Sequence, residues 1–343
     1  HQAVFFDDLA SLGHREWGVI GVGMHRPHMR AALAPQDGLY TVDERGADGE
    51  RGRGGAANTD YLYAPEHREA VLDALADPRV RLVTLTITGG GYDVASAGPS
   101  SALGLLVEGL ARRREAGLAP FTVLSCDNLP GNGPLSRAAV VELAGRKDPA
   151  LAAWVEEHGA FPSSMVDRIT PRTTDADRAW VARTFGVDDR WPVLTEPFSQ
   201  WIVEDRFCAG RPPLELVGVQ FVPDVTPYAL LKTRMLNASH CALGHLGSLA
   251  GHRRTDEAMD DPVLRAAIRR LMADEVAPLL PEVPGVDVAA YRAMVLERLS
   301  NPVLGDRLER LCRNGSGKMP VHVLSSLQSA RAAGGLAALL TLT

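Results

Sequence analysis

The feature that most constrains the fold is the alternation of short apolar runs with amphipathic helical patterns along the first third of the chain. Three apolar runs predict short buried strands, at residues 16–24 (EWGVIGVGM), 81–88 (RLVTLTIT) and 121–126 (FTVLSC). Between them, residues 64–77 and 100–116 carry apolar side chains three and four positions apart, which indicates helices that pack on one face. Strands that alternate with helices predict an α/β fold with a parallel, doubly wound sheet.

Beyond about residue 225 the pattern changes to long helices joined by short turns that contain proline or glycine. Helical periodicity is found at residues 227–250, 260–279, 289–300 and 302–312. Two segments before them, 191–207 and 213–225, alternate enough to predict strands that extend or flank the sheet. A chain of 343 residues exceeds what one core usually organises. We therefore expect a sheet-containing domain over 1–224 and a mainly α-helical domain over 225–343, with the low-complexity segment 46–58 as a loop.

Composition narrows the class of function. Lysine and arginine number 36 against 42 acidic residues and are dispersed, so there is no basic patch for a nucleic acid or a membrane surface. No apolar run reaches the roughly 18 residues that a membrane span needs, and no signal sequence is seen. Cysteines 126, 208, 241 and 312 lack the spacing of a zinc site or a disulfide framework. These observations predict a soluble cytoplasmic protein that acts on a small molecule.

The loops that follow the predicted strands are where ligands bind in doubly wound sheets. They are Gly21–Met24, Thr88–Gly91 and Cys126–Gly133. The first begins like a dinucleotide-binding G-x-G-x-x-G, but Arg26 occupies the third glycine position. We interpret these glycines as the end of a buried strand, beside a ligand but not under its pyrophosphate. Residues 1–10 read as the interior of a helix already under way, which predicts that the chain begins after its first βα turn.

The predicted helix at 227–250 carries three polar residues in a mostly apolar setting: Lys232, Asn237 and His240. At about 100° per residue, Asn237 lies about 140° and His240 about 80° around the axis from Lys232, so all three can face one cavity. A lysine whose amine is partly buried has its charged form disfavoured, which moves it toward the range of a general base. From residue types alone, the commoner interpretation of Lys232 is a side chain that extends along the surface to reach water. The commoner interpretation of His240 is a core histidine whose hydrogen bonds are satisfied within the protein.

Four sequence motifs together carry a resemblance to a known protein family. They are SCDNLPGNG at 125–133, FPSSMVDRITP at 161–171, EPFSQWIVEDRF at 196–207 and KTRMLNASH at 232–240. Together they closely resemble the polyol-specific long-chain dehydrogenases, the family of mannitol 2-dehydrogenase that also includes fructuronate reductase. The resemblance covers nearly the whole chain and continues through residues 284–302 and 310–320. It implies a Rossmann-like sheet domain, with its first strand missing here, followed by a helical substrate domain.

The resemblance implies a metal-independent hydride transfer between nicotinamide C4 and C2 of an open-chain polyol or ketose, with NAD as cofactor and no zinc. Lys232 would be the general base, while Asn128 and Asn237 would hold the developing alkoxide by hydrogen bonds. His240 would bind a neighbouring hydroxyl, and Asp167 would lie beside the lysine.

The same resemblance assigns residues farther from the reacting carbon. Arg310 and Lys318, which bracket the NGSGK turn, would hold the far hydroxyls, although by residue type alone they would be taken for solvated surface charges. The cofactor would contact Gly23, Met24, Thr88 and Gly89. Family members are often monomeric, so a monomer is expected.

Three departures from the family pattern bear on the cofactor. The glycine-rich loop that precedes the segment matching His1-Gln2-Ala3 is absent, and the family continues past Thr343, so we expect a chain truncated at both ends. The loop Met24–His28 is basic where NAD-preferring members often carry acids, which is compatible with the 2′-phosphate of NADP. Ser163 and Gly89 also replace usual family residues near the expected nicotinamide.

Three functions therefore stay open at this point. The first is a dehydrogenase for a mannitol/fructose or arabinitol/xylulose type of pair, which retention of the five site residues favours. The second is a reductase of hexuronates such as fructuronate or tagaturonate, which would need one more cation for the carboxylate. The third is a catalytically silent nucleotide-binding protein.

Overall fold

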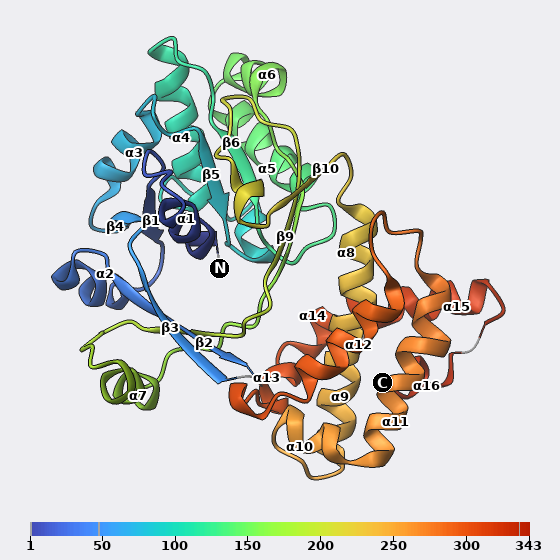
Figure 1. The fold of residues 1–343 in the computed structure, drawn as a ribbon. Coiled ribbons are helices and arrows are strands. Elements are labelled where there is room, and N and C mark those ends of the chain that lie inside the picture. The colour runs from blue at the N-terminus through green and yellow to red at the C-terminus, as the bar shows by residue number, and fades with distance from the viewer. Residues whose placement is uncertain (1, 47–48, 336) are drawn as a thin grey trace. The chain divides into compact units, whose positions relative to one another are not determined.

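The computed structural model describes residues 2–46, 49–335 and 337–343. It divides into two compact units, one formed by His1–Glu44 with Arg51–Val225 and the other by Arg45–Glu50 with Thr226–Thr343. The strands and the first seven helices precede residue 226, and the helices of the second unit follow it (Figure 1).

Parallel pairing dominates the strands. β1 (Val19–Gly23) pairs with β4 (Asn58–Tyr63), and β5 (Leu82–Leu85) pairs with β6 (Thr122–Ser125), both in parallel. β7 (Ser164–Asp167) runs antiparallel to β9 (Gln200–Glu204), whose other edge pairs in parallel with β10 (Gln220–Val222). A further group has the order β3-β2-β8, from Gly49–Gly55, Tyr40–Gly46 and Val193–Thr195. The strands predicted within 191–207 and 213–225 are confirmed as β8, β9 and β10.

Some helices of the first unit begin at side-chain caps. The unit contains α1 (Gln2–Ser11), α2 (His28–Leu33), α3 (Arg68–Ala76), α4 (Ala102–Glu115), α5 (Asn132–Lys147), α6 (Pro149–His158) and α7 (Asp175–Phe185), of which α4, α6 and α7 carry these caps. The Ser101 hydroxyl accepts the N–H of Gly104 at the start of α4, and Thr174 forms a capping box with Asp177 at the start of α7. The helices predicted at 64–77 and 100–116 are confirmed as α3 and α4.

The core of the first unit lies on both faces of β5 and β6. Val123 of β6 packs with α4, α5 and α6 in one apolar cluster. The next residue, Leu124, packs with Phe5 of α1 and Trp201 of β9 in another. Because successive strand residues point to opposite faces, the strand is covered on both sides. This burial is typical of a doubly wound sheet and confirms the predicted α/β class.

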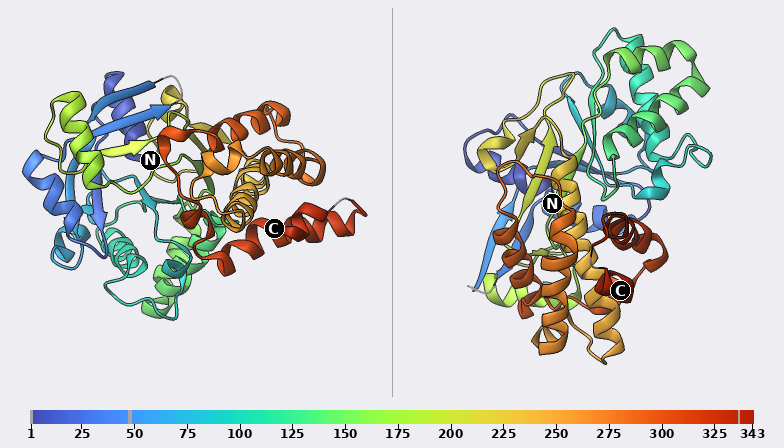
Figure 2. Two further views of the ribbon diagram at one scale, coloured as in Figure 1. Left: turned by 90° about the horizontal axis from the view of Figure 1, so that it is seen from below. Right: turned by 90° about the vertical axis from the view of Figure 1, so that its right-hand side faces the viewer.

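The second unit is helical, as expected. Its helices are α8 (Thr226–Lys232), α9 (Ala238–Leu249), α10 (Thr255–Asp260), α11 (Pro262–Arg270), α12 (Val288–Leu299), α13 (Leu308–Cys312), α14 (Gly315–Met319), α15 (Ser325–Ala332) and α16 (Ala338–Leu342). Three π turns join consecutive helical segments, at Thr233–Asn237, Leu271–Val276 and Pro320–Leu324. The first connects α8 to α9 so that both continue as one long rod (Figures 1 and 2). Within the described ranges, no helix has both the length and the apolar character to cross a membrane.

Two predictions about local structure are wrong. Segment 46–58 is not a loop, because β3 spans Gly49–Gly55 and β4 begins at Asn58. β3 is a strand because it hydrogen-bonds to β2, while most of its residues are exposed. The sequence therefore shows no apolar pattern that would predict it. The strand at 16–24 is confirmed as β1, but it is not buried: Ile20 is 41% exposed and Val22 40%. Among the described strands β1 pairs only with β4, and the face that carries these two side chains is uncovered.

Candidate functional site

The glycines at the end of β1 are explained by a neighbouring strand. A Cβ at Gly21 would lie 2.4 Å from the ring of Tyr61 on β4, and a Cβ at Gly23 would lie 2.9 Å from the Tyr61 hydroxyl. This crowding supports the interpretation that the glycines end a strand. Met24 follows, half-buried against the cluster that contains Leu62.

The loop that follows β5 contains a strained residue. Thr88 has φ +62° and ψ 171°, a region that is essentially restricted to glycine. The carboxylate of Asp127 holds it there, because it accepts the N–H of Ile87 at 3.0 Å and the N–H of Thr88 at 2.8 Å. The Tyr92 hydroxyl donates to the same carboxylate at 2.8 Å. Strain that persists because its surroundings enforce it is concentrated at functional sites, so this loop is a candidate ligand contact.

Asp127 was missed in the sequence analysis, although it lies inside the SCDN motif next to Asn128. Its role depends on pairing with residues 39 and 40 positions away, which no local pattern encodes. The structure places Asn128 at the surface and Asp167 in a buried position, 5% exposed, at the end of β7. Asn132 links these segments, since its amide donates to the carbonyls of Asp127 and Ser164 at 3.0 and 2.8 Å.

Lys232 is the last residue of α8 and is only 5% exposed. The π turn that follows changes the angles predicted for an uninterrupted α-helix. A π turn closes i→i+5 hydrogen bonds, so it holds about one residue more than an α turn and sets the following residues back by about 100°. His240 then lies about 20° from Lys232 instead of 80°, and Asn237 about 40° instead of 140°. The predicted angles were wrong, and the π turn gathers the three residues more closely on one face.

The imidazole of His240 lies in a positively charged part of the second unit. Burial lowers its pKa well below 6.5, and the charges of Arg310, Arg298, Lys232 and Lys318 lower it further. Its Nε2 atom is buried and has no hydrogen-bond partner among the described residues. His240 is therefore neutral at pH 7, and its ring has a nitrogen available to a polar ligand.

A second histidine, His322, was not singled out from the sequence. Burial lowers its pKa from 6.5 to about 4, with further lowering by Lys232 and Lys318. Its Nδ1 atom is also buried and unpartnered within the described ranges. The only signal in the sequence is its place four residues after Lys318.

Arg310 and Lys318 make definite contacts in the second unit. The exposed Arg310 guanidinium binds Asp306 through both carboxylate oxygens, with Nε to Oδ1 at 2.6 Å. The Lys318 amine donates to the carbonyls of Arg310 and Leu311 at 3.3 and 3.2 Å. Burial lowers the pKa of Lys318. A role for either residue in holding a substrate hydroxyl stays a prediction.

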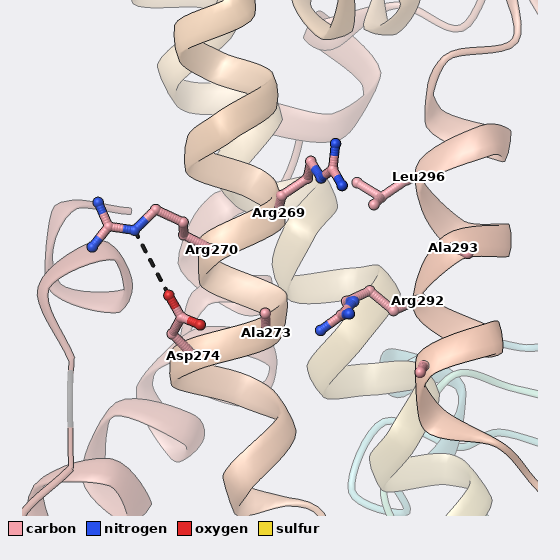
Figure 3. A pocket seen from close by; sticks show the side chains of 8 residues that line it. Arg269, Arg270, Ala273, Asp274, Arg292, Ala293 and Leu296 are labelled. Atoms are coloured by element: carbon pink, nitrogen blue, oxygen red, sulfur yellow. Dashed lines mark ion pairs between the residues drawn. The ribbon is translucent and has the colours of Figure 1, made fainter.

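A separate pocket of about 300 Å³ lies between α11 and α12 (Figure 3). None of the predicted site residues lines it. Arg270 turns toward Asp274, with 3.7 Å between nitrogen and oxygen, while Arg269 and Arg292 extend into the space between the helices. Across the described parts of the chain, no group of three or more histidine, cysteine, aspartate or glutamate side chains is arranged to hold a metal ion.

Comparison with known proteins gives concordant matches along the chain. Residues 1–216 match the family model of the mannitol dehydrogenase Rossmann domain, and residues 224–343 match that of the mannitol dehydrogenase C-terminal domain. The chain is 45% identical to mannitol 2-dehydrogenase of Pyricularia oryzae, over 96% of this chain and 71% of that protein. It is 44% identical to mannitol 2-dehydrogenase of Pyrenophora tritici-repentis, over 100% of this chain and 65% of that protein.

Solved structures agree with these matches. The Pseudomonas fluorescens mannitol 2-dehydrogenase, in a ternary complex with NAD and D-mannitol, superposes with a TM-score of 0.92 at 40% identity. That match covers 100% of this chain and 74% of the solved one. A D-sorbitol dehydrogenase in substrate-free form gives a TM-score of 0.91 at 36% identity, covering 99% of this chain and 75% of the solved one.

Proposed function

Because the chain belongs to the mannitol dehydrogenase family, we propose that it transfers a hydride between NAD and C2 of an open-chain polyol or the corresponding ketose. The observation that carries the proposal is the buried Lys232, followed by a π turn whose rotation would bring Asn237 and His240 to its face of the helix. The solved relative bound to NAD and D-mannitol supports this choice of cofactor and substrate class.

We infer that the loop after β5 in the first unit receives the dinucleotide. β5, which pairs in parallel with β6, is followed by a loop in which Thr88, Gly89 and Gly90 are exposed, and doubly wound sheets bind cofactors at the carboxyl ends of their strands. No atom lies within 4 Å of a Cβ built at Gly90, so a flat ring can approach the backbone there. We assign Thr88 and Gly89 to the nicotinamide side and Gly23 and Met24 to the adenosine side. When bound, NAD supplies the nicotinamide carbon that accepts or donates the hydride.

In this proposal the residues of the second unit handle the proton and the hydroxyl groups. Lys232 removes the proton of the C2 hydroxyl during oxidation and returns it during reduction. Asn237 donates its amide N–H to the alkoxide as charge develops, and the neutral His240 binds an adjacent hydroxyl. Arg310 and Lys318 bind hydroxyls farther along the chain.

Two residues of the first unit complete the assignment, following the family resemblance. The roles of Asn128 as a second amide donor to the alkoxide and of Asp167 in tuning the charge of the lysine stay predictions from that resemblance. Each donor of this kind typically contributes about a hundredfold in rate.

The test is absorbance at 340 nm with the intact protein, NAD or NADP, and a panel of polyols, ketoses and hexuronates. We expect turnover of a 2-hydroxy polyol. Turnover confined to fructuronate or tagaturonate would reassign the substrate, and no turnover with any of them would refute the proposal. The ratio of kcat/KM with NAD and NADP decides the cofactor, since His25 and Arg26 are exposed at the end of β1.

The role of Lys232 is tested by Lys232→Ala, which should lower kcat by about 10²- to 10⁴-fold at neutral pH and leave NAD binding intact. Lys147→Ala is the matched control, because that lysine is exposed and pairs with Glu108 at 2.7 Å. Equal turnover by the two variants would reject Lys232 as the base.

A further inference from the structure

His322 lies in the π turn Pro320–Leu324, which packs against the π turn after Lys232 and against α9. Its Nδ1 atom is buried without a hydrogen-bond partner in the described chain. His240, the third residue of α9, has a buried Nε2 atom that likewise lacks a hydrogen-bond partner in the described chain. Two imidazoles thus present unsatisfied buried nitrogens from two segments that pack together.

The same two lysines affect the pKa values of both imidazoles. The charges of Lys232 and Lys318 each contribute to lowering the pKa of His240 and of His322. The buried hydroxyls of Ser239 and Ser326, next to His240 and one turn after His322, also have no hydrogen-bond partner among the residues described. Buried polar atoms are normally paired, so unpaired atoms on segments that pack together indicate a polar ligand or ordered water.

We propose that His322 binds one hydroxyl of the polyol and helps to determine which polyol is accepted. The inference rests on the proposed function and extends it to a residue outside the motifs that carry the family resemblance. A neutral imidazole has one donor and one acceptor nitrogen, and a hydroxyl both donates and accepts, so the two match in either tautomer. A site that pairs its buried groups with a hydroxyl rejects substrates that lack it, because the protein atom is left unpaired.

The experiment measures kcat/KM for the preferred ketose or polyol and for each of its monodeoxy analogues, in wild type and in His322→Leu. In wild type, loss of the bound hydroxyl should lower kcat/KM by about 10- to 100-fold. In His322→Leu the penalty at that one carbon should fall to about twofold, while the penalties at the other carbons stay unchanged. His322→Asn, whose amide can replace the ring nitrogen, should recover part of the discrimination.

His252→Leu is the matched control, because His252 belongs to the same unit and pairs with Asp261 at 3.4 Å. It should leave every monodeoxy penalty as in wild type. If His322→Leu also keeps every penalty, the inference fails, and an ordered water then accounts for the unpaired nitrogen. If His322→Leu does not fold, His322→Met and His322→Ala decide, since neither side chain can bind a hydroxyl as the imidazole does and an unchanged penalty pattern in both overturns the proposal. Absence of any polyol turnover in wild type is a different outcome, which refutes the proposed function itself.

Discussion

Replacing Asp127 by asparagine tests whether this carboxylate holds the loop after β5. In the structure its two oxygens accept three bonds, from the N–H groups of Ile87 and Thr88 and from the Tyr92 hydroxyl, at 2.8 to 3.0 Å. An amide has a single acceptor oxygen. The amide is better placed with its oxygen at the position of Oδ2, because it then keeps the two bonds from Ile87 and Tyr92. Its NH₂ group then faces the N–H of Thr88, which loses its acceptor.

The expected cost follows from that geometry. One buried donor left unpaired costs about 1–3 kcal/mol, and relaxation of Thr88 from its strained conformation returns part of this. A net loss of about 2 kcal/mol corresponds to a fall in Tm of about 4–8 °C for a unit of this size. Because the released loop must be reordered to bind cofactor, we also expect the Kd for NAD to rise about 10- to 30-fold.

Thermal unfolding and calorimetric titration with NAD measure the two effects. Tyr92→Phe is the control, since it removes the bonds of the hydroxyl to Asp127 and Ser125 but keeps both backbone contacts of Asp127, and should cost about 2 kcal/mol without weakening NAD binding. Combining Asp127→Asn with Thr88→Gly should reduce the loss of stability, because glycine adopts the conformation without strain. An unchanged Kd in Asp127→Asn would refute the claim that this carboxylate positions the loop, whatever the Tm.

Two further outcomes are expected. Gly21→Ala should lower the free energy of unfolding by about 1–3 kcal/mol, because its Cβ would lie 2.4 Å from the Tyr61 ring. Gly90→Ala should not lower it, because the space around that position is open. Equal denaturant midpoints for the two variants would contradict this expectation. For His322, the folded pKa of about 4 lies below the unfolded value of 6.5, so its contribution to stability is complete above pH 6.5 and is lost as the pH falls toward 4. Allowing for partial solvent screening, this loss is about 2 kcal/mol, and urea unfolding at pH 7 and pH 4.5 should show a smaller pH dependence in His322→Asn than in wild type.

Local patterns were sufficient for the elements that bury an apolar face. The strands β5 and β6 and the helices α3 and α4 were predicted because apolar spacing directly reports which side of an element is covered. The strand β3 was missed because its state depends on hydrogen bonds to β2, not on burial of its mostly glycine and charged residues. β1 was predicted correctly as a strand, but its exposure depends on which neighbours cover it.

The candidate site divides in the same way. The sequence by itself determined the α/β class, the helical second half and the family, together with the motif residues that family membership singles out, such as Lys232 and Asn128. Only the tertiary structure decided the angle around the helix axis between Lys232 and His240. A π turn inserts about one residue into a helix whose apolar pattern looks continuous in the sequence. The tertiary structure also decided the surroundings of Asp127 and His322, since each depends on groups that come together only when the helices and strands pack.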